Sequence, residues 1–543
     1  MRNIIKKILD FLKLNWQGKL LILFIILMIL PYCYLALTTG SKFYSPDETA
    51  NFIFAKNIAE NNSLKIDIAI NKEVDNIIFP RSVNVLDGYY VPMSFLGLPI
   101  FYGLIGKIIG ANNITFITPL ISLVAGFILF SILKQLFDKN IALISAIILL
   151  LNPVYWYLAG KGLLHNNLFI FFVLLGLFLL IKALKRQQLI LFFISALLFG
   201  ASIWTRTSEI FWIGLLLLIF YWYNRKNVNW KGFLAFVVGF CGMLSLLLFI
   251  NYETYGNILR SGYSALDQSA KTTPASLLMQ IILPLGFNLR NIMFHSWEFL
   301  FKYLWLLILP AIWGLIAYRK QPQSEPQKAY YVICFIVSTY LIISYGSYWP
   351  WGEYGQPNDP TFLIGGPHLR YWNPLLIFLT PFIAFSLWEL LPRLFKNVKF
   401  IKPIFLTVFF ALLIIFSSNQ VLFEKQEGFL KIKNDILDFQ PRLDKVNATI
   451  TPEAILIIPD WADRIFFPDY QVIHSLGDKR IYAGDAYAQV GKLVQIKPIY
   501  LYSSDSQADM AELNKTLTKY NLSLNFITDI YKGEKLYQIK NAD

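Results

Sequence analysis

The segment Ser45-Pro46-Asp47-Glu48-Thr49-Ala50 follows closely on an apolar run at residues 20–37. The run is long enough to cross a membrane and has no small-residue cleavage site, so we expect a retained first transmembrane helix. Pro46 suits the first turn of a helix, and Ser45 or Asp47 can cap its free amides, which predicts a second helix beginning here. Its two carboxylates then lie at the membrane boundary, either as ordinary caps or as functional groups.

The composition is that of a polytopic membrane protein. Of the 543 residues, 56% are hydrophobic and only 15% are charged, which is more apolar than a soluble protein of this length. A net charge of +14 would suggest nucleic acid in a soluble protein, but here the basic residues gather in short loops between apolar runs. We therefore expect no nucleic-acid partner. The three cysteines lie far apart within apolar runs, which indicates neither a disulfide framework nor a cysteine metal site.

Apolar runs of spanning length predict about eleven transmembrane helices. They lie at residues 20–38, 115–133, 140–158, 168–184, 189–205, 210–223, 231–250, 299–318, 329–346, 373–391 and 402–418. A further run at 92–110 contains two prolines and four glycines. If it crossed the membrane, five basic loops would move to the outer side together, which the positive-inside rule disfavours. We expect 92–110 to lie along the outer interface and the N-terminus to be cytoplasmic.

The predicted fold class is a polytopic α-helical membrane protein with a C-terminal soluble α/β domain. Residues 1–418 form the transmembrane domain, with a large first outer loop at 39–114, and residues 419–543 form an extracytoplasmic domain. In this tail charged residues become frequent and apolar runs shorten to strand length. Strands are predicted at 454–458 and 499–502, a helix at 506–520, and a hairpin of 524–527 with 536–539 around Lys532-Gly533.

Acidic residues in the outward loops are the first candidates for chemistry, because those loops converge on one face. Asp47 and Glu48 lead, since apolar surroundings raise the proton affinity of a carboxylate, which can then accept a proton from an attacking hydroxyl or amine. Either could be the general base. The four histidines never reach paired metal-ligand spacing, and Asp47 and Glu48 could bind a divalent ion only with distant partners. We expect no obligatory metal and no other cofactor.

Basic residues in the other outward loops are candidates for substrate binding. Arg206 lies between two spans with almost no loop, and is either a phosphate contact or an interfacial arginine paired with Glu209. Arg370 stands just before a span, where its guanidinium fork matches the oxygens of a lipid phosphate. Lys161 and His165 occupy the second outer turn and could help to bind an anion, although a lone histidine is more often structural.

The outer loop at 347–372 is dense in aromatic and charged residues, among them His368 and Tyr371 beside Arg370. Such residues either line a substrate site or form the aromatic belt of the membrane interface.

Several pieces of the chain resemble the GT-C glycosyltransferases, especially the protein O-mannosyltransferase and lipid A aminoarabinose transferase group. The matching pieces span residues 40–380, and the Asp-Glu element is the most specific. They are Pro46-Asp47-Glu48 with Phe52 and Ala55, Tyr89-Tyr90-Val91-Pro92, Pro99 with Gly103, the turn Lys134–Lys139, Asn152-Pro153, and Arg370-Tyr371 with Pro374. The resemblance implies a polyprenyl-phosphate-linked sugar donor, Asp47 as the catalytic base, and a juxtamembrane helix at 92–110. Many relatives carry an acid in the second outer loop, where this chain has Gly160–Asn167 without one.

The sequence thus predicts a GT-C hexosyl- or pentosyltransferase in the cytoplasmic membrane. It would transfer a sugar with inversion from a polyprenyl phosphate to an extracytoplasmic protein, glycolipid or envelope glycan. Asp47 would act as base, Glu48 would orient the acceptor or share that role, and Arg370 with Arg206 or Lys161 would stabilise the departing phosphate. Tyr89, Tyr371, His165 and His368 complete the predicted substrate site. A transporter or flippase of polyprenyl-linked lipids or glycans is the alternative, and a non-catalytic scaffold is a third.

Overall fold

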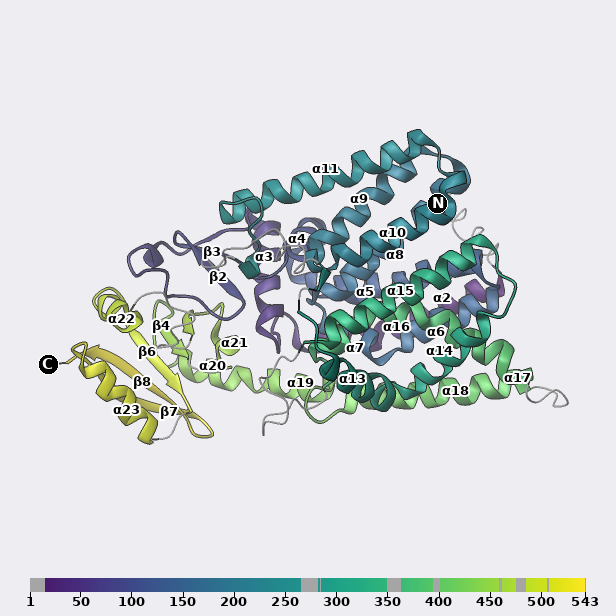
Figure 1. The fold of residues 1–543 in the computed structure, drawn as a ribbon. Coiled ribbons are helices and arrows are strands. Elements are labelled where there is room, and N and C mark those ends of the chain that lie inside the picture. The colour runs from purple at the N-terminus through teal and green to yellow at the C-terminus, as the bar shows by residue number, and fades with distance from the viewer. Residues whose placement is uncertain are drawn as a thin grey trace, which may run out of the picture. The chain divides into compact units, whose positions relative to one another are not determined.

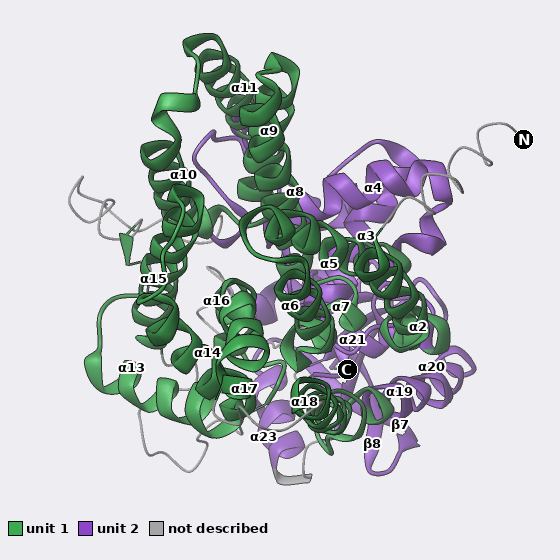
Figure 2. Cartoon of the chain, turned by 90° about the vertical axis from the view of Figure 1, so that its right-hand side faces the viewer, with its two compact units in different colours: residues 1–38, 116–247, 270–431 green, residues 39–115, 248–269, 432–543 purple. Residues whose placement is uncertain are grey.

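The computed structural model describes residues 15–264, 282–283, 285–348, 363–393, 401–458, 461–474, 485–504 and 507–542. The chain forms two compact units, each assembled from separate stretches of sequence (Figure 2). The first unit comprises residues 1–38, 116–247 and 270–431, and the second comprises residues 39–115, 248–269 and 432–543. The first outer loop therefore groups with the C-terminal segment.

The first unit is a bundle of apolar helices (Figure 1). Its α-helices are α2 (Trp16–Thr39), α5 (Ile117–Leu136), α6 (Lys139–Leu151), α7 (Pro153–Lys161), α8 (His165–Arg186), α9 (Leu189–Thr205), α10 (Ile210–Asn224), α11 (Trp230–Tyr255), α13 (Leu289–His295), α14 (Trp305–Tyr318), α15 (Glu325–Gly346), α16 (Pro367–Phe385), α17 (Leu391–Arg393) and α18 (Ile401–Ser418). Short 3-10 or π segments interrupt them at η3 (Thr207–Glu209), η4 (Arg225–Asn227), η6 (Ser296–Tyr303), η7 (Ser386–Leu390) and η8 (Asn419–Phe423). Helix α8 packs on α5 and α9, and α16 packs on α6, α14 and α15.

The described residues contain seven helices long and apolar enough to span a membrane, or up to ten if each of three bent pairs is one span. The prediction of a multi-pass helical membrane protein is therefore confirmed. The sequence predicted eleven spans, one more than the ten obtained when each bent pair is counted once. The difference lies at Leu189–Thr205 and Thr207–Asn227, which meet at a bend of 119° and which the sequence analysis counted as two spans. The predicted span at 299–318 is also broken, because α14 begins only at Trp305 after a bend of 102°.

The break between α6 and α7 follows from Asn152-Pro153. Proline lacks the amide that would continue the helical ladder, and the Asn152 carboxamide instead accepts from the amides of Val154 (3.0 Å) and Tyr155 (3.4 Å). The two helices meet at 54°. Helix α7 then ends at Lys161, followed by Gly162 with φ +92°, a backbone conformation that suits glycine.

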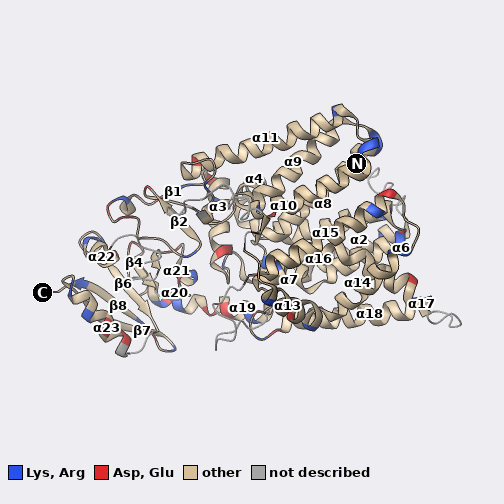
Figure 3. Cartoon of the chain, viewed as in Figure 1, with Lys and Arg blue, Asp and Glu red and all other residues tan. Residues whose placement is uncertain are grey.

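The basic turns of the first unit lie together at one end of its helices, where Figure 3 shows Lys and Arg in blue. Side chains cross-link these turns. Lys185 Nζ donates to Gln135 Oε1 (2.8 Å), Gln187 Nε2 to the Asn227 carbonyl (2.8 Å), and Gln327 Nε2 to the Leu136 carbonyl (2.7 Å). Arg206 stands at the opposite end of α9 from Leu189. The basic turns after α5, α8 and α10 and the turn before α15, which were predicted to share one side of the membrane, thus share one end of the bundle. Residues 394–400 of the fifth predicted turn lie outside the described residues.

The second unit contains the first outer loop, with helices α3 (Pro46–Asn61) and α4 (Gly97–Ile109) and a sheet of β1 (Ile66–Asp67), β2 (Val83–Leu86) and β3 (Tyr89–Pro92) in the antiparallel order β1-β3-β2. The helix predicted within 92–110 is α4; its 13 residues extend about 20 Å, too short to cross a hydrocarbon core of about 30 Å. Helices α3 and α4 pack tightly, since a Cβ added at Gly103 would lie 2.6 Å from Ile58 Cβ.

The C-terminal part of this unit is an α/β domain. Its strands are β4 (Ile455–Ile458), β5 (Gln471–His474), β6 (Ile499–Ser503), β7 (Leu522–Tyr531) and β8 (Glu534–Asn541), in the order β5-β4-β6-β8-β7. Its helices are α19 (Phe429–Leu437), α20 (Phe439–Asn447), α21 (Asp463–Phe466), α22 (Ala486–Val494) and α23 (Gln507–Thr518). Strands β5, β4 and β6 are parallel, and the β7–β8 hairpin closes at Lys532 (φ +39°) and Gly533 (φ +94°). The predicted strands, helix and hairpin are confirmed, whereas β5, α19, α20, α21 and α22 were not predicted.

The first outer loop completes the core of the α/β domain. Val74, Ile77 and Ile78 are at most 3% exposed and share one hydrophobic cluster with residues of β4, β5, β6 and β8. A backbone bridge joins Phe79 to Ile473, with the His474 amide donating to the Phe79 carbonyl (3.2 Å). These two segments, far apart in sequence, form a common core.

Candidate active site

Asp47 lies in the first turn of α3 but does not cap it. The N-cap residue Ser45 makes no side-chain cap hydrogen bond, and the Asp47 carboxylate accepts instead from the Ser82 hydroxyl, with Oγ 2.5 Å from Oδ1. Ser82 has φ +63°, which is uncommon for a residue with a Cβ. Strained backbone that aims a polar group at a carboxylate is typical of functional sites. The alternative of an ordinary capped helix therefore does not describe this carboxylate.

Glu48 occupies a different environment from its neighbour. Its side chain is 2% exposed, whereas Asp47 is half-buried. Asn51, one turn along α3 and 1% exposed, accepts a hydrogen bond from Ser94 (2.9 Å), so this face of the helix lies against the loop after β3. Of the two acids, Asp47 is the more accessible to a substrate.

Helix α21 fixes both sides of this acidic turn. Arg81, the neighbour of Ser82, donates from its backbone amide to Asp463 Oδ2 (3.0 Å) and from Nε to both carboxylate oxygens (3.0 Å). Asp463 is 1% exposed, so this is a buried ion pair. Arg464 Nη1 donates to the Tyr44 carbonyl (2.6 Å), just before α3. The α/β domain thereby holds the segments that carry Asp47 and its hydrogen-bond donor.

A polar cavity of about 320 Å³ lies beside α21 within the second unit. It is lined by Asp435, Asp438, Phe439, Arg442, Trp461, Ala462, Arg464, Ile465 and Glu534. Trp461 is 62% exposed, and Arg442 pairs with Glu534 (2.7 Å). Arg464 has a buried Nε without a hydrogen-bond partner among the described residues, and burial lowers its pKa from the ordinary value. An aromatic surface among charged groups of both signs suits a polar ligand.

In the first unit, Arg206 belongs to a closed cluster. Its Nη2 lies 2.7 Å from Glu209 Oε1, and its guanidinium stacks 5.0 Å from the ring centre of Tyr371. Glu209 also accepts from Trp212 Nε1 (2.5 Å) and from the Tyr345 hydroxyl (2.6 Å). Tyr345 and Tyr371 in turn stack with ring centres 4.6 Å apart. The predicted ion pair of Arg206 with Glu209 therefore exists.

Arg370 enters the same cluster from the first turn of α16. Its guanidinium lies 5.9 Å from the Tyr371 ring centre, and its carbonyl accepts from Asn166 Nδ2 (2.8 Å). Its buried Nε has no hydrogen-bond partner, and no carboxylate pairs with it among the described residues. Both arginines and Glu209 line one narrow pocket together with Asn166, Phe169, Ile170, Tyr371, Asn373 and Pro374. Two cations and one anion give this cluster a net positive charge, although the space between its side chains is too small to hold even a water molecule in this structure.

Comparison with known proteins shows which fold this chain shares. Residues 91–250 match the family described as dolichyl-phosphate-mannose-protein mannosyltransferase. The oligosaccharyltransferase of Archaeoglobus fulgidus tethered with an acceptor peptide aligns with a TM-score of 0.54 and 12% identity over 98% of this chain and 75% of that one. The chain has the fold of a GT-C glycosyltransferase. The resemblance predicted from the sequence is thereby confirmed.

Two more structures of the same archaeal enzyme share the GT-C fold. The complex with zinc and sulfate aligns with a TM-score of 0.53 and 14% identity, over 95% of this chain and 73% of that one. The complex with an inhibitory peptide and a dolichol-phosphate aligns with a TM-score of 0.50 and 11% identity, over 97% of this chain and 75% of that one. No curated protein matches this chain.

The other predicted site residues fall in both units. Lys161 at the end of α7 and His165 at the start of α8 are each 8% exposed, and His165 lies within electrostatic reach of Arg206 and Arg370. Tyr89 lies on β3 in the second unit, and the Lys72 Nζ atom lies over its ring, 5.1 Å from the ring centre. The structure thus groups Arg206, Arg370, Tyr371 and His165 in the first unit, and places Asp47, Glu48 and Tyr89 in the second.

His368 has a packing role in the bundle. Its Nε2 lies 3.0 Å from the Tyr348 carbonyl oxygen, and its ring centre is 3.8 Å from that of His295 and 5.2 Å from that of Phe299. These contacts hold the first turn of α16, which carries Arg370. The substrate contact expected of His368 stays a prediction.

No group of three or more His, Cys, Asp or Glu side chains in the described part of the chain could hold a metal ion. The absence of an obligatory metal stays a prediction.

Sequence reasoning missed three residues near Asp47, namely Ser82, Arg81 and Asp463. Nothing local marks Ser82 as a left-handed residue, and the ion pair of Arg81 with Asp463 joins positions 382 apart. The acids of 349–362 lie outside the described residues.

Proposed function

We propose that this protein transfers a sugar from a polyprenyl phosphate to an acceptor outside the cytoplasmic membrane, with inversion at the anomeric carbon. The observation that carries the proposal is Asp47, a half-buried carboxylate held by Ser82 rather than used as a helix cap, within a GT-C fold. The matched family and the archaeal oligosaccharyltransferase support a polyprenyl-linked sugar as donor.

Asp47 serves as the general base. One carboxylate oxygen accepts from Ser82, and the other has no partner among the described residues. That second oxygen takes the proton of the acceptor hydroxyl or amine as the acceptor atom bonds to the anomeric carbon. The bond from the anomeric carbon to the phosphate oxygen breaks with its electron pair, so polyprenyl phosphate departs. Buried Glu48 orients the acceptor or shares the proton.

Arg370 is the first choice for the contact to the lipid phosphate. Its buried Nε has no hydrogen-bond partner among the described residues, whereas the charge of Arg206 is already compensated by Glu209. A guanidinium aimed at developing negative charge stabilises a departing phosphate. Lys161 and His165 supply further polar contacts in this unit, and Tyr371 holds both arginines by its ring.

The cavity beside α21 is the proposed acceptor site. Its mixed charges and exposed Trp461 offer hydrogen bonds and a stacking surface to a peptide, glycolipid or glycan. An acceptor peptide is bound by the archaeal neighbour. The basic end of the bundle supports a cytoplasmic N-terminus by the positive-inside rule. With the eleven spans expected from the sequence, the chain after residue 418 would then lie on the outer side.

The test compares wild type with Asp47→Asn in lipid, using radiolabelled polyprenyl-phosphate sugars and a membrane extract as acceptor. We expect polyprenyl phosphate to be released by wild type, and Asp47→Asn to release it at least 100-fold more slowly, because positioned bases typically contribute that much. Glu60→Gln, an exposed acid of the same helix paired with Lys56, is the matched control and should release it normally. If no donor is turned over but labelled lipid changes leaflet, the protein is a flippase.

A further inference from the structure

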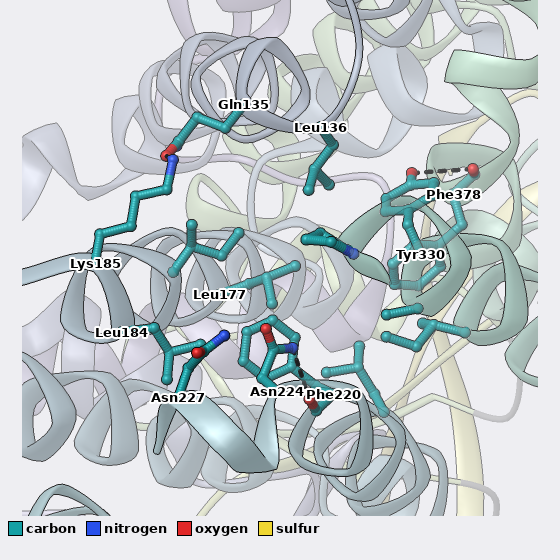
Figure 4. A pocket seen from close by; sticks show the side chains of 15 residues that line it. Gln135, Leu136, Leu177, Leu184, Lys185, Phe220, Asn224, Asn227, Tyr330 and Phe378 are labelled. Carbon is teal, nitrogen blue, oxygen red and sulfur yellow. Dashed lines mark hydrogen bonds between the residues drawn. The ribbon is translucent and has the colours of Figure 1, made fainter. Parts of the chain in front are cut away.

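A second cavity lies inside the helical bundle, away from the arginine cluster. It measures about 350 Å³, which falls in the range of about 300–1,000 Å³ typical of small-molecule sites. It is bounded by α5, α8, α10, α15 and α16 of the first unit (Figure 4). Most of its lining is apolar, including Leu177, Leu216, Phe220, Ile333 and Phe378. We call it the lateral groove.

Polar groups gather at one side of the lateral groove. Figure 4 shows Lys185 and Gln135 there, with Asn224 and Asn227, and Tyr330 and Phe378 on the opposite side. Lys185 Nζ donates to the neutral Gln135 amide oxygen (2.8 Å) and has no carboxylate partner in the described chain. Its positive charge at the rim of the groove is therefore uncompensated.

The depth of the groove matches one leaflet. Leu177 precedes Lys185 by eight residues in α8, and Leu216 precedes Asn224 by eight residues in α10. Eight residues of helix rise about 12 Å, close to half of a hydrocarbon core of about 30 Å. The groove thus reaches from the basic turns to about the middle of the membrane.

The lateral groove is separate from the proposed donor site. His165, near Arg206 and Arg370, begins the same helix that carries Lys185 at its end, twenty residues later. That separation is about 30 Å along α8. A polyprenyl donor with its phosphate at Arg370 would place that phosphate at the wrong end of the groove.

We infer that the lateral groove binds one acyl chain of an anionic phospholipid from the leaflet at the basic end, with its phosphate at Lys185. The apolar lining takes the chain. Gln135 Nε2 and Asn224 Nδ2 each donate one hydrogen bond to a backbone carbonyl, of Ser131 and Phe220 (both 2.8 Å), so each amide offers its second N–H, together with the amide of Asn227, to the headgroup and glycerol oxygens. An anionic headgroup compensates the charge of Lys185, whereas a zwitterionic one does so only in part. Such a lipid would hold α8, α10 and α15 together.

The experiment is native mass spectrometry of the protein released from nanodiscs containing phosphatidylglycerol or phosphatidylcholine. We expect wild type to retain phosphatidylglycerol several-fold more than phosphatidylcholine. Leu216→Trp fills the groove and should lose the retained lipid, and Lys185→Gln should keep a lipid but lose the preference. Lys226→Gln, a basic residue of the neighbouring turn that does not line the groove, is the matched control and should behave as wild type.

Thermal unfolding of each variant separates lost binding from lost fold. If Leu216→Trp does not fold, Leu177→Phe blocks the same groove from α8. Equal retention of both lipids by wild type, unchanged retention by a folded groove-filling variant, or displacement of phosphatidylglycerol by stoichiometric polyprenyl phosphate would each overturn the inference. None of these outcomes depends on glycosyl transfer.

Discussion

Ser82 donates its hydroxyl to Asp47 from a left-handed backbone conformation, 35 positions along the chain from the carboxylate that it contacts. Glycine would adopt that backbone more easily, so the serine is there at a conformational cost. The arginine before it is held by the buried carboxylate of Asp463. The hydrogen bond therefore depends on the α/β domain as much as on the first outer loop.

Ser82→Gly should separate activity from stability. The substitution relieves the left-handed backbone, so the melting temperature should be unchanged or slightly higher. It removes a hydrogen bond to a charged group, worth about 1.5–3 kcal/mol, so the rate of polyprenyl phosphate release should fall about 10- to 100-fold. Ser82→Ala should lose as much activity and also be less stable than Ser82→Gly. Wild-type rates in Ser82→Gly would show that the hydroxyl does not position Asp47.

Arg370 and Arg206 should respond differently to the same substitution. Arg370→Gln removes a guanidinium that pairs with no carboxylate among the described residues, so it should weaken donor binding, measured as a raised KM, with little loss of stability. Arg206→Gln leaves the buried carboxylate of Glu209 uncompensated, which typically costs about 3–5 kcal/mol. Its melting temperature should therefore fall clearly.

The double variant Arg206→Gln with Glu209→Gln is the control for that interpretation. Removing both charges eliminates the unpaired carboxylate, so stability should recover toward wild type. Donor KM in the double variant then reports whether the Arg206 charge contacts the donor. A donor KM that rises for Arg206→Gln but not for Arg370→Gln would reverse the assignment of the phosphate contact.

The sequence predicted the parts of this protein that are set by local patterns. Apolar runs located the helices, Pro46 located the start of α3, and the Lys532-Gly533 turn located the β7–β8 hairpin, because each depends on neighbouring residues only. The count of spans was less certain where a helix breaks, as at Arg206, since a bend leaves the hydropathy of its two arms unchanged.

The sequence did not predict contacts between distant segments. Arg81 and Asp463 are ordinary charged residues in their own neighbourhoods, and only the tertiary fold joins them. The same holds for Tyr345 and Tyr371, whose stacking explains how Arg206 is fixed. The candidates Asp47 and Arg370 were found because a charge beside a membrane span is unusual, which is a local signal.

The buried ion pair of Arg81 and Asp463 should be needed to hold the acidic turn. Arg81→Gln leaves a carboxylate that is 1% exposed without its partner, so we expect a loss of about 3–5 kcal/mol in the free energy of unfolding. Sugar transfer should also fall, because Arg81 is adjacent to Ser82. Lys42→Gln breaks the exposed pair with Asp469 and should change stability by less than about 1 kcal/mol, which makes it the control.

The first outer loop should be required for folding of the α/β domain. Ile78 is fully buried in the cluster that also holds Ile457, Ile473 and Leu501, so Ile78→Ala should cost about 2–5 kcal/mol. A fragment of residues 432–543 lacks Val74, Ile77 and Ile78, and we expect it to aggregate or to show weak protection in hydrogen exchange. The same fragment fused by a flexible linker to residues 64–92 should recover protection of β4 and β6. If the fragment alone is monomeric, with a sharp unfolding transition, the shared core contributes little to its folding.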